Sequence, residues 1–498
     1  MNAGQMPTQH VRVAVVGAGF GGIATGARLK QAGEHNFVIL ERNARPGGTW
    51  HVNTYPGAQC DIPSILYSFS FAPNPNWTRL YPTQDEIAAY LRDCVTRFGL
   101  SEHIHCNQDV TAMVWDGTGQ RWRVSTAGGT WTADVLVLAT GPFSEPAIPD
   151  IPGLDRFGGT VFHSAAWRHD HDLRGERVAV IGTGASAVQF IPRIQPRVAH
   201  LTVFQRTPTW ILPHPDRTVP GPVRALFHRV PATQRGLRWL INLAHECLVP
   251  GMVRRPDLLR PLAALGRRHL NRRVKEPALR RALTPTYAFG CKRPTFSNRY
   301  FPALTQPNVT LETDTIAEAT ATGIRTASGT EHTLDTIVLA TGFRLSRNEG
   351  FHRIIGRHGR SLADTWNGGT EMSAYLGTTI SGFPNLYMIL GPNCVVYTSQ
   401  IVTIEAQVDY IIDALRVMRE RRLSNLEVTG EAQQHFREKV DRGLATSVWN
   451  TGGCRSYYLS PTGRNYAFWP GTAASFRRTM RNLRLEDYHA HAAERVRA

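Results

Sequence analysis

The segment RVAVVGAGFGG, residues 12–22, decides the fold of this chain. Its mostly apolar, β-branched start predicts a buried parallel strand that runs straight into a glycine-rich turn. In that turn Gly17 permits a tight bend, and Gly19 lets the backbone approach a pyrophosphate at the helix N-terminus. Gly22 lets the following helix pack closely on the strand. The segment therefore predicts a dinucleotide-binding βαβ unit.

The residues that follow indicate which nucleotide this unit holds. Residues 23–31 predict a helix and residues 37–40 a second strand, which ends at Glu41. A carboxylate at this strand end can accept hydrogen bonds from a ribose 2′-hydroxyl and would repel a 2′-phosphate. We therefore expect FAD or NAD at the first unit, and not NADP.

The same pattern returns at residues 177–187, RVAVIGTGASA, and the next predicted strand, 201–204, ends in Gln205 and Arg206. The expected nucleotide-binding residues here are Gly182, Thr183, Gly184, Ser186, Ala187, Gln205 and Arg206. Arg206 stands at the same offset from its loop as Glu41 does from the first. Because an arginine can pair bidentately with a 2′-phosphate, we expect NADP(H) at the second unit. The alternative is a solvated strand end.

These two units predict an α/β fold with two Rossmann-like dinucleotide-binding domains. Two strands that end in Ala-Thr-Gly, at 139–141 and 340–342, resemble the chain crossings of flavoproteins with two such domains. We expect residues 1–150 and 335–498 to form the FAD domain and residues 151–334 the NADP domain. A helical insertion at about 213–285 is expected within the NADP domain.

The charge of the chain is concentrated in this insertion. The net charge is +17, and residues 213–285 hold about fifteen Lys and Arg against four Asp and Glu. Such a segment is compatible with a nucleic-acid or membrane-surface role. No basic motif interleaved with aromatic residues accompanies it, so we favour a solvated, arginine-rich helical face and expect no nucleic-acid partner.

The seven cysteines are scattered and form no CxxC pair, which argues against a disulfide framework or a zinc site and for a reducing compartment. No metal site is expected. The N-terminus lacks the layout of a signal peptide, and no apolar run reaches the length of a membrane-spanning helix. These features predict a cytoplasmic protein without a transmembrane segment.

Two further stretches resemble those of a known family. Residues 157–167, FGGTVFHSAAW, place Phe157, Gly159, His163 and Trp167 at the spacing of the fingerprint of the Baeyer–Villiger monooxygenases. Residues 48–61 resemble a second signature of these enzymes, carried by Gly48, Trp50, Tyr55, Pro56, Gly57 and Asp61. The family usually follows the fingerprint tryptophan with Pro or Asp, whereas this chain has Arg168.

The resemblance implies roles for particular residues. Gly48, Thr49, Trp50, Asp61 and Tyr67 would lie at the flavin, and the backbone of Val110 at its adenine. In the segment CKRP, which in the family precedes a strand containing a tyrosine (here Tyr300), Lys292 would join the 2′-phosphate clamp. Arg293 would reach the flavin, paired with Asp61. His163 and Trp167 would be positional, and Tyr457 stands in a mobile loop where the family commonly has Trp.

The resemblance also implies an activity. FAD, NADPH and dioxygen would convert a small-molecule ketone to an ester or lactone through a C4a-peroxyflavin, with Arg293 and Asp61 as the catalytic residues. One alternative is oxygenation of nitrogen or sulfur. A second is an NADPH-dependent flavin reductase without oxygenation, and a third is a basic nucleic-acid- or membrane-binding protein with a decayed flavin site.

Overall fold

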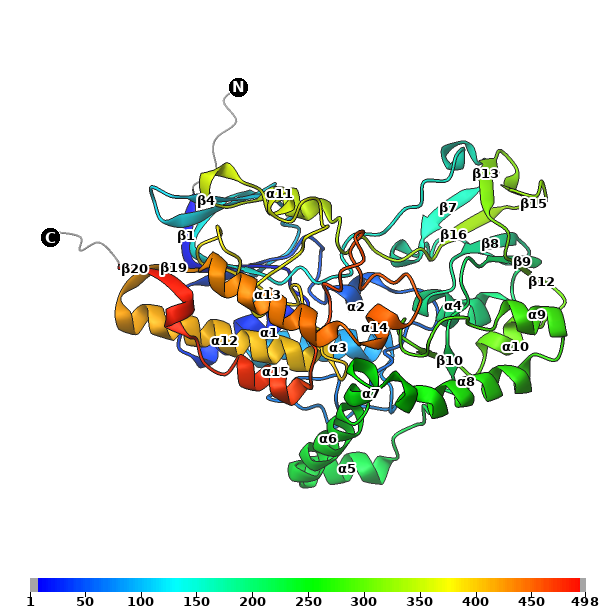
Figure 1. Cartoon of the computed structure of the whole chain (residues 1–498), viewed down its shortest axis with the longest axis horizontal. Coiled ribbons are helices and arrows are strands. Elements are labelled where there is room, and N and C mark those ends of the chain that lie inside the picture. Colours follow the sequence, from blue (N-terminus) through cyan, green and yellow to red (C-terminus); the bar gives the residue numbers. More distant parts are fainter. Residues whose placement is uncertain (1–7, 493–498) are drawn as a thin grey trace.

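The computed structural model describes residues 8–492, and its two largest sheets occupy opposite ends of the molecule (Figure 1). The first sheet has eight strands in the order β17-β4-β5-β6-β1-β2-β3, with β18 paired to β6. Its strands are β1 (Gln9–Val16), β2 (Phe37–Leu40), β3 (Ile104–His105), β4 (Val110–Asp116), β5 (Arg121–Thr126), β6 (Gly129–Leu138), β17 (Ile354–Ile355) and β18 (Leu386–Met388).

The centre of the first sheet is apolar on both faces. Strand β1 pairs in parallel with β2 and β6, and Val13, Ala14 and Val15 are fully buried. Burial on both faces explains the nearly continuous run of apolar residues in this strand. Helix α1 (Phe20–Gln31) leaves the loop after β1 and packs against α12 (Gln400–Arg421), so a late segment of the chain completes the first unit.

The second sheet repeats this construction with five parallel strands, in the order β12-β9-β8-β16-β7. They are β7 (Thr160–His163), β8 (Arg177–Ile181), β9 (His200–Phe204), β12 (Val309–Glu312) and β16 (Thr336–Leu339). Helix α4 (Ala185–Ile194) follows β8 as α1 follows β1. Because β16 pairs with β7 and β8, the predicted boundary between residues 334 and 335 is too early, and the chain leaves the second sheet only after Leu339.

The remaining strands form three small sheets: β10 (Ile211–Leu212) with β11 (Thr295–Phe296); β13 (Ile316–Thr320), β14 (Gly323–Thr326) and β15 (Glu331–Thr333); and β19 (Leu423–Val428) with β20 (Tyr488–Ala492).

The predicted insertion is helical: α5 (Gly221–Arg229), α6 (Pro231–Glu246), α7 (Val249–Val253), η3 (Pro256–Leu259), α8 (Arg260–Arg273) and α9 (Pro277–Ala282). The other helices that bear on the site are α2 (Thr49–Val52), α3 (Gln84–Arg97), α10 (Tyr300–Leu304), α14 (Val448–Thr451) and α15 (Ala473–Thr479). Further short elements are α11 (Leu362–Thr365), α13 (Gly430–Leu444), η1 (Leu154–Arg156), η2 (Ser164–Ala166), η4 (Glu349–Arg353), η5 (Arg357–Gly359) and η6 (Leu485–Asp487).

Two features of this region differ from the predictions. Tyr300 was expected in a strand but begins α10, where its side chain is buried near α4 and α8. The insertion also packs on more than the second sheet. Gln234 of α6 donates to the Asn74 carbonyl, and the Glu246 carboxylate accepts from the Ala473 backbone, so the insertion covers segments attached to the first sheet. No helix between residues 8 and 492 is long and apolar enough to span a bilayer.

Candidate active site

The first glycine loop has no room for side chains. Gly17 has a φ of +103°, and a Cβ there would lie 2.6 Å from the Ala139 carbonyl oxygen. A Cβ on Gly22 would lie 1.9 Å from the Gly17 oxygen, since α1 starts directly against the strand. The first turn of α1 carries no acidic residue. This tight, anion-accepting helix N-terminus fits the pyrophosphate of a dinucleotide.

The second loop has the same geometry. Gly182 has a φ of +109°, and a Cβ there would lie 2.4 Å from the Ala340 oxygen. Each loop therefore faces the alanine of one Ala-Thr-Gly strand end. A Cβ on Gly184 would meet no atom within 4 Å, which leaves its backbone open to a ligand. Ala187 in the first turn of α4 is fully buried, and Gly22 is buried at the corresponding place in α1. This loop also fits a pyrophosphate.

Glu41 has a structural role that the sequence did not indicate. Its side chain is 3% exposed; Oε2 accepts a 2.8 Å hydrogen bond from the backbone N–H of Ala18 in the first loop. Oε1 accepts from the backbone and side-chain nitrogens of Asn43 at 2.9 and 2.6 Å. The carboxylate thus holds the loop that it follows in sequence. Its predicted contact with a ribose remains a prediction.

At the second strand end the charge is positive and exposed. Arg206 lies on the surface, and burial, together with the charge of Arg206, lowers the pKa of Lys292. The Lys292 ammonium lies 5.2 Å from the centre of the Tyr287 ring. Within residues 8–492 neither cation forms an ion pair with a carboxylate. Gln205 differs from both, because its side chain turns inward and donates to the Ala282 carbonyl at 2.8 Å.

Asp61 and Arg293 form the bidentate pair that the resemblance implied. Arg293 Nε donates to Asp61 Oδ2 at 2.5 Å, and Nη2 donates to Oδ1 at 3.0 Å. Burial opposes the charged form of Arg293, but the Asp61 carboxylate raises the pKa of Arg293 well above its ordinary value. Tyr458 and Tyr397 act in the same direction. Neither tyrosine was predicted as a site residue; Tyr458 lies beside Tyr457, while Tyr397 belongs to no motif.

The second signature lies directly on the first loop. Gly48 has a φ of +54°, and a Cβ there would lie 2.9 Å from the Gly19 Cα, so the two glycines pack backbone to backbone. Thr49 and Trp50 then begin α2, and the Trp50 indole donates to the Tyr67 hydroxyl at 3.1 Å. Burial raises the pKa of Tyr67. The structure therefore brings these flavin-site candidates together.

Two residues of this region have backbone or side-chain partners elsewhere. The buried Val110 begins β4, and its carbonyl accepts a 2.9 Å hydrogen bond from Arg353. Its predicted adenine contact stays a prediction. The Tyr55 hydroxyl donates to Gln189 on α4 at 3.0 Å, so the second signature also contacts the helix of the second loop.

The fingerprint residues lie at the edge of the second sheet. Phe157 is buried, and a Cβ on Gly159 would lie 2.2 Å from the Asp335 oxygen. His163 ends β7 opposite Leu339, and burial lowers its pKa. The Trp167 ring lies 5.2 Å from the ring of Phe190 on α4. These contacts tie the fingerprint to the second sheet.

Arg168, the departure from the family pattern, pairs with Asp170 at 2.6 Å on the surface. Both side chains of this pair are exposed, and the contact spans only two residues of the chain. The departure therefore forms a local surface pair, away from the buried contacts of Phe157 and His163.

An aromatic row connects the fingerprint with the C-terminal part of the chain. Its members are His163, Phe343, Phe143 and Tyr457, with successive ring centres 5.8, 5.4 and 6.5 Å apart. Phe143 and Phe343 follow the two Ala-Thr-Gly strand ends. The row therefore runs across both segments that join the two sheets.

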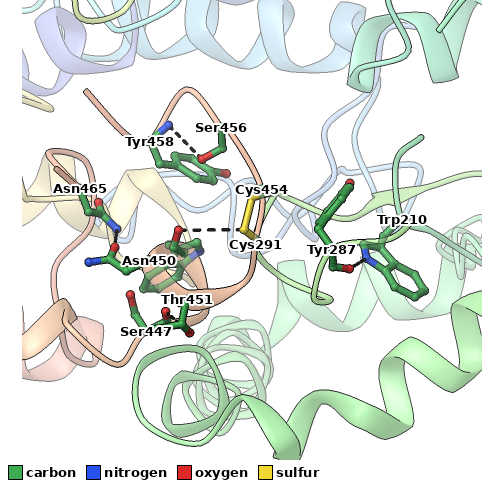
Figure 2. The surroundings of a disulfide bond; sticks show 11 residues. Trp210, Tyr287, Cys291, Ser447, Asn450, Thr451, Cys454, Ser456, Tyr458 and Asn465 are labelled. Atoms are coloured by element: carbon green, nitrogen blue, oxygen red, sulfur yellow. Dashed lines mark hydrogen bonds between the residues drawn. A yellow bond between two sulfur atoms is a disulfide. The ribbon is translucent and has the colours of Figure 1, made fainter. Parts of the chain in front are cut away.

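Cys291 and Cys454 form a disulfide, which the sequence analysis argued against (Figure 2). The two residues are 163 positions apart, so no local spacing could have indicated the pair. The bond joins the residue before Lys292 to the segment that carries Tyr457 and Tyr458. The cation that we assign to the nucleotide phosphate and this C-terminal segment are therefore held covalently.

Comparisons with known proteins agree with this geometry. The family model of the pyridine nucleotide-disulphide oxidoreductases matches residues 14–220. A Baeyer-Villiger monooxygenase of Streptomyces coelicolor is 47% identical, covering 96% of this chain and 92% of its own length. Another from Pseudomonas aeruginosa is 44% identical, covering 97% and 92%.

Solved structures give the same result over nearly the whole chain. A steroid monooxygenase bound to NADP has a TM-score of 0.86 and 31% identity, covering 97% of this chain and all of its own. Cyclohexanone monooxygenase from Rhodococcus sp. Phi1, bound to NADP⁺, has a TM-score of 0.87 and 29% identity, covering 98% and 100%. The predicted α/β fold with two Rossmann-like domains is confirmed. The chain belongs to the Baeyer–Villiger monooxygenases, FAD-dependent oxidoreductases that use NADPH.

Proposed function

We propose that this enzyme uses NADPH and dioxygen to insert one oxygen atom beside the carbonyl of a small-molecule ketone, giving an ester or lactone. The Asp61–Arg293 pair carries the proposal. When bound, FAD supplies the redox chemistry, accepting a hydride from NADPH and activating dioxygen. Relatives named for cyclohexanone and steroids make cyclic ketones the first substrates to test.

Arg293 supplies a fixed positive charge. Its raised pKa keeps it protonated throughout the working pH range, and its two bonds to Asp61 fix the plane of the guanidinium. A charge held in place beforehand stabilises negative charge that develops at a reacting oxygen without reorganisation at that moment. Asp61 also compensates the half-buried cation when no substrate is bound.

The two loops divide the nucleotides between them. FAD is assigned to the first loop and the second signature, with Gly17, Gly19, Gly22, Glu41, Gly48, Thr49, Trp50, Tyr67 and Val110. NADPH is assigned to the second loop, with its 2′-phosphate between Arg206 and Lys292. Neither cation has a carboxylate partner in the described part of the chain, which supports that assignment because an anion would neutralise both.

The fingerprint has a positional role in this proposal. The aromatic row joins His163 to Tyr457 across the connections between the sheets, so that movement of one part displaces the other. The FAD domain comprises the first sheet, and the NADP domain comprises the second. We place the enzyme in the cytoplasm because it needs a supply of NADPH; the Cys291–Cys454 disulfide removes the argument from a reducing compartment.

Oxygen labelling tests the reaction. The FAD-containing enzyme, NADPH and cyclohexanone under ¹⁸O₂ should give lactone with one labelled oxygen and one NADPH consumed per product. Arg293→Ala should lower lactone formation by about 100-fold or more while FAD stays bound. Arg357→Ala, which removes a comparable ion pair with Glu427, is the control. Hydrogen peroxide as the sole oxygen product, or oxidation of a thioether but no ketone, would contradict the proposal.

A further inference from the structure

Helix α6 turns two polar side chains, Gln234 and Arg238, inward beside the partly buried Ile241. Gln234 is 4% exposed, and its amide donates to the Asn74 carbonyl at 2.7 Å. Arg238 reaches inward four residues later and donates to the carbonyls of Ile65 and Ser68 at 2.6 and 2.8 Å. These bonds fix the rotation of α6 about its axis. Its apolar side therefore faces away from the protein.

The outward side of α6 is strongly apolar. Trp239 is 63% exposed, Leu240 55% and Leu243 43%. A surface helix normally buries such a stripe and exposes its charged residues. Here the bonded inward residues exclude a rotation that would bury Trp239, because Arg238 would lose its carbonyl partners.

Neighbouring residues extend this surface. Helix α5 packs against α6, and the two lie at the lower tip of the molecule, away from both large sheets (Figure 1). Leu226 and Val230 are each 45% exposed, and Leu237 is 36% exposed. We call Leu226, Val230, Leu237, Trp239, Leu240 and Leu243 the α5–α6 patch. Single exposed apolar residues are ordinary, but a cluster of this kind on one helix pair marks an interaction surface.

The charge around the patch selects the partner. Arg229 and Arg235 are exposed beside it, and Arg224 is half-buried. The only acidic residue of α5 and α6 is Glu246, which accepts a hydrogen bond from the Ala473 backbone. A helix with tryptophan and leucine on one side and arginines at its margins is the kind that lies in the headgroup region of an anionic bilayer.

We propose that the α5–α6 patch docks this enzyme on the surface of an anionic lipid bilayer, with Trp239 and Leu240 entering the headgroup region. A second copy of the chain fits less well, because it would bring two cationic tips together on a protein of net charge +17. A nucleic acid would leave the outward apolar side chains without a partner. The docking does not depend on which ketone the enzyme oxidises.

Vesicle sedimentation tests the proposal. The FAD-containing enzyme should sediment with vesicles of phosphatidylcholine and phosphatidylglycerol, but much less with phosphatidylcholine alone. The triple variant Trp239→Ser, Leu240→Gln, Leu243→Gln should weaken binding by about tenfold or more. Arg229→Gln with Arg235→Gln should weaken it by about tenfold or more and reduce its dependence on salt. Ile148→Gln, at an exposed apolar residue outside the patch, is the matched control and should bind unchanged.

Other outcomes overturn the proposal. Bound FAD and NADPH oxidation by the triple variant would show that it is folded. If it does not fold, the single Trp239→Ser variant takes its place, and a smaller loss of vesicle binding is expected. Equal sedimentation of the variant and the parent enzyme would refute the patch as the docking site. So would a dimer in light scattering that dissociates in the triple variant, or binding to DNA that exceeds binding to vesicles.

Discussion

The two glycine loops have similar backbone conformations but are followed by strands that end in residues of opposite charge. Glu41 is 3% exposed and bonded to its own loop, whereas Arg206 is exposed and lies near a second cation, Lys292. The backbone of both loops thus fits a pyrophosphate, and we propose that the residue at the end of the following strand distinguishes the two nucleotides. At the first site the deciding residue is part of the fold; at the second it is available to a ligand.

The loops also differ in how tightly they are packed. A Cβ on Gly19 would lie 3.4 Å from the Gly48 Cα, whereas one on Gly184 would meet nothing within 4 Å. Gly19 is covered by its own chain, whereas Gly184 is open. Substitutions in the first loop should therefore affect the fold and FAD together, whereas a substitution of Gly184 should affect only NADPH.

The largest effect is expected from Gly22→Ala. Its Cβ would lie 1.9 Å from a backbone oxygen, so the strand and α1 would have to separate, at a cost of about 3 kcal/mol. Flavin absorbance after gel filtration should show loss of FAD, and unfolding should occur at lower denaturant. Gly184→Ala, a glycine substitution in the second loop at the counterpart of Gly19, should keep FAD and stability while weakening NADPH. Retention of FAD by Gly22→Ala would contradict the expected difference between the two glycine loops.

Arg206→Ala tests the deciding residue of the second site. Loss of a charge-assisted pair with a phosphate costs about 1.5–3 kcal/mol. The KM for NADPH should therefore rise about 10- to 100-fold, while that for NADH changes little. Arg177→Ala, which breaks a surface pair with Asp335 in the same sheet, should change neither. An equal rise for both nucleotides would show that Arg206 does not read the 2′-phosphate.

Glu41→Gln tests the first site. One carboxylate oxygen would become an amide N–H facing a donor, either Ala18 or Asn43, at a cost of about 1–3 kcal/mol. Fluorescence titration of the apoenzyme should show FAD bound about tenfold more weakly, with the KM for NADPH unchanged. Glu34→Gln, at an ion pair with Arg12 in the same unit, is the control. Unchanged FAD affinity would show that the hydrogen bonds of Glu41 do not contribute to FAD binding.

The smallest effect concerns pH. Burial and Arg206 lower the pKa of Lys292, so its charge is lost as the pH rises through a value below the usual one for lysine. The KM for NADPH should then increase on the alkaline side. Arg206→Gln removes one source of the depression and should move this increase to higher pH, while Lys292→Gln should abolish it. If the KM for NADPH still increases at alkaline pH in Lys292→Gln, a group other than Lys292 causes the increase.

Sequence patterns predicted what depends on local backbone or on motif spacing. The Asp61–Arg293 pair was implied by the family resemblance, since its residues are 232 positions apart. Both loops, and the opposite charges of Glu41 and Arg206, follow from residues whose roles are fixed by neighbours in the chain. The Cys291–Cys454 bond does not, because it depends on how distant segments meet. The orientation of α6 could not be predicted for another reason. An apolar stripe on a surface helix normally faces the core, and the carbonyl partners of Arg238 show that this stripe faces outward.

The disulfide has a thermodynamic consequence for the second site. It closes a covalent ring that contains the second Ala-Thr-Gly strand end, and it starts one residue before Lys292. If oxidation of the two thiols changes the affinity for the nucleotide, then by linkage the bound nucleotide changes the midpoint potential of the thiol pair by the same free energy. The oxidation state of Cys291 and Cys454 is then thermodynamically coupled to nucleotide binding at the proposed phosphate site between Arg206 and Lys292.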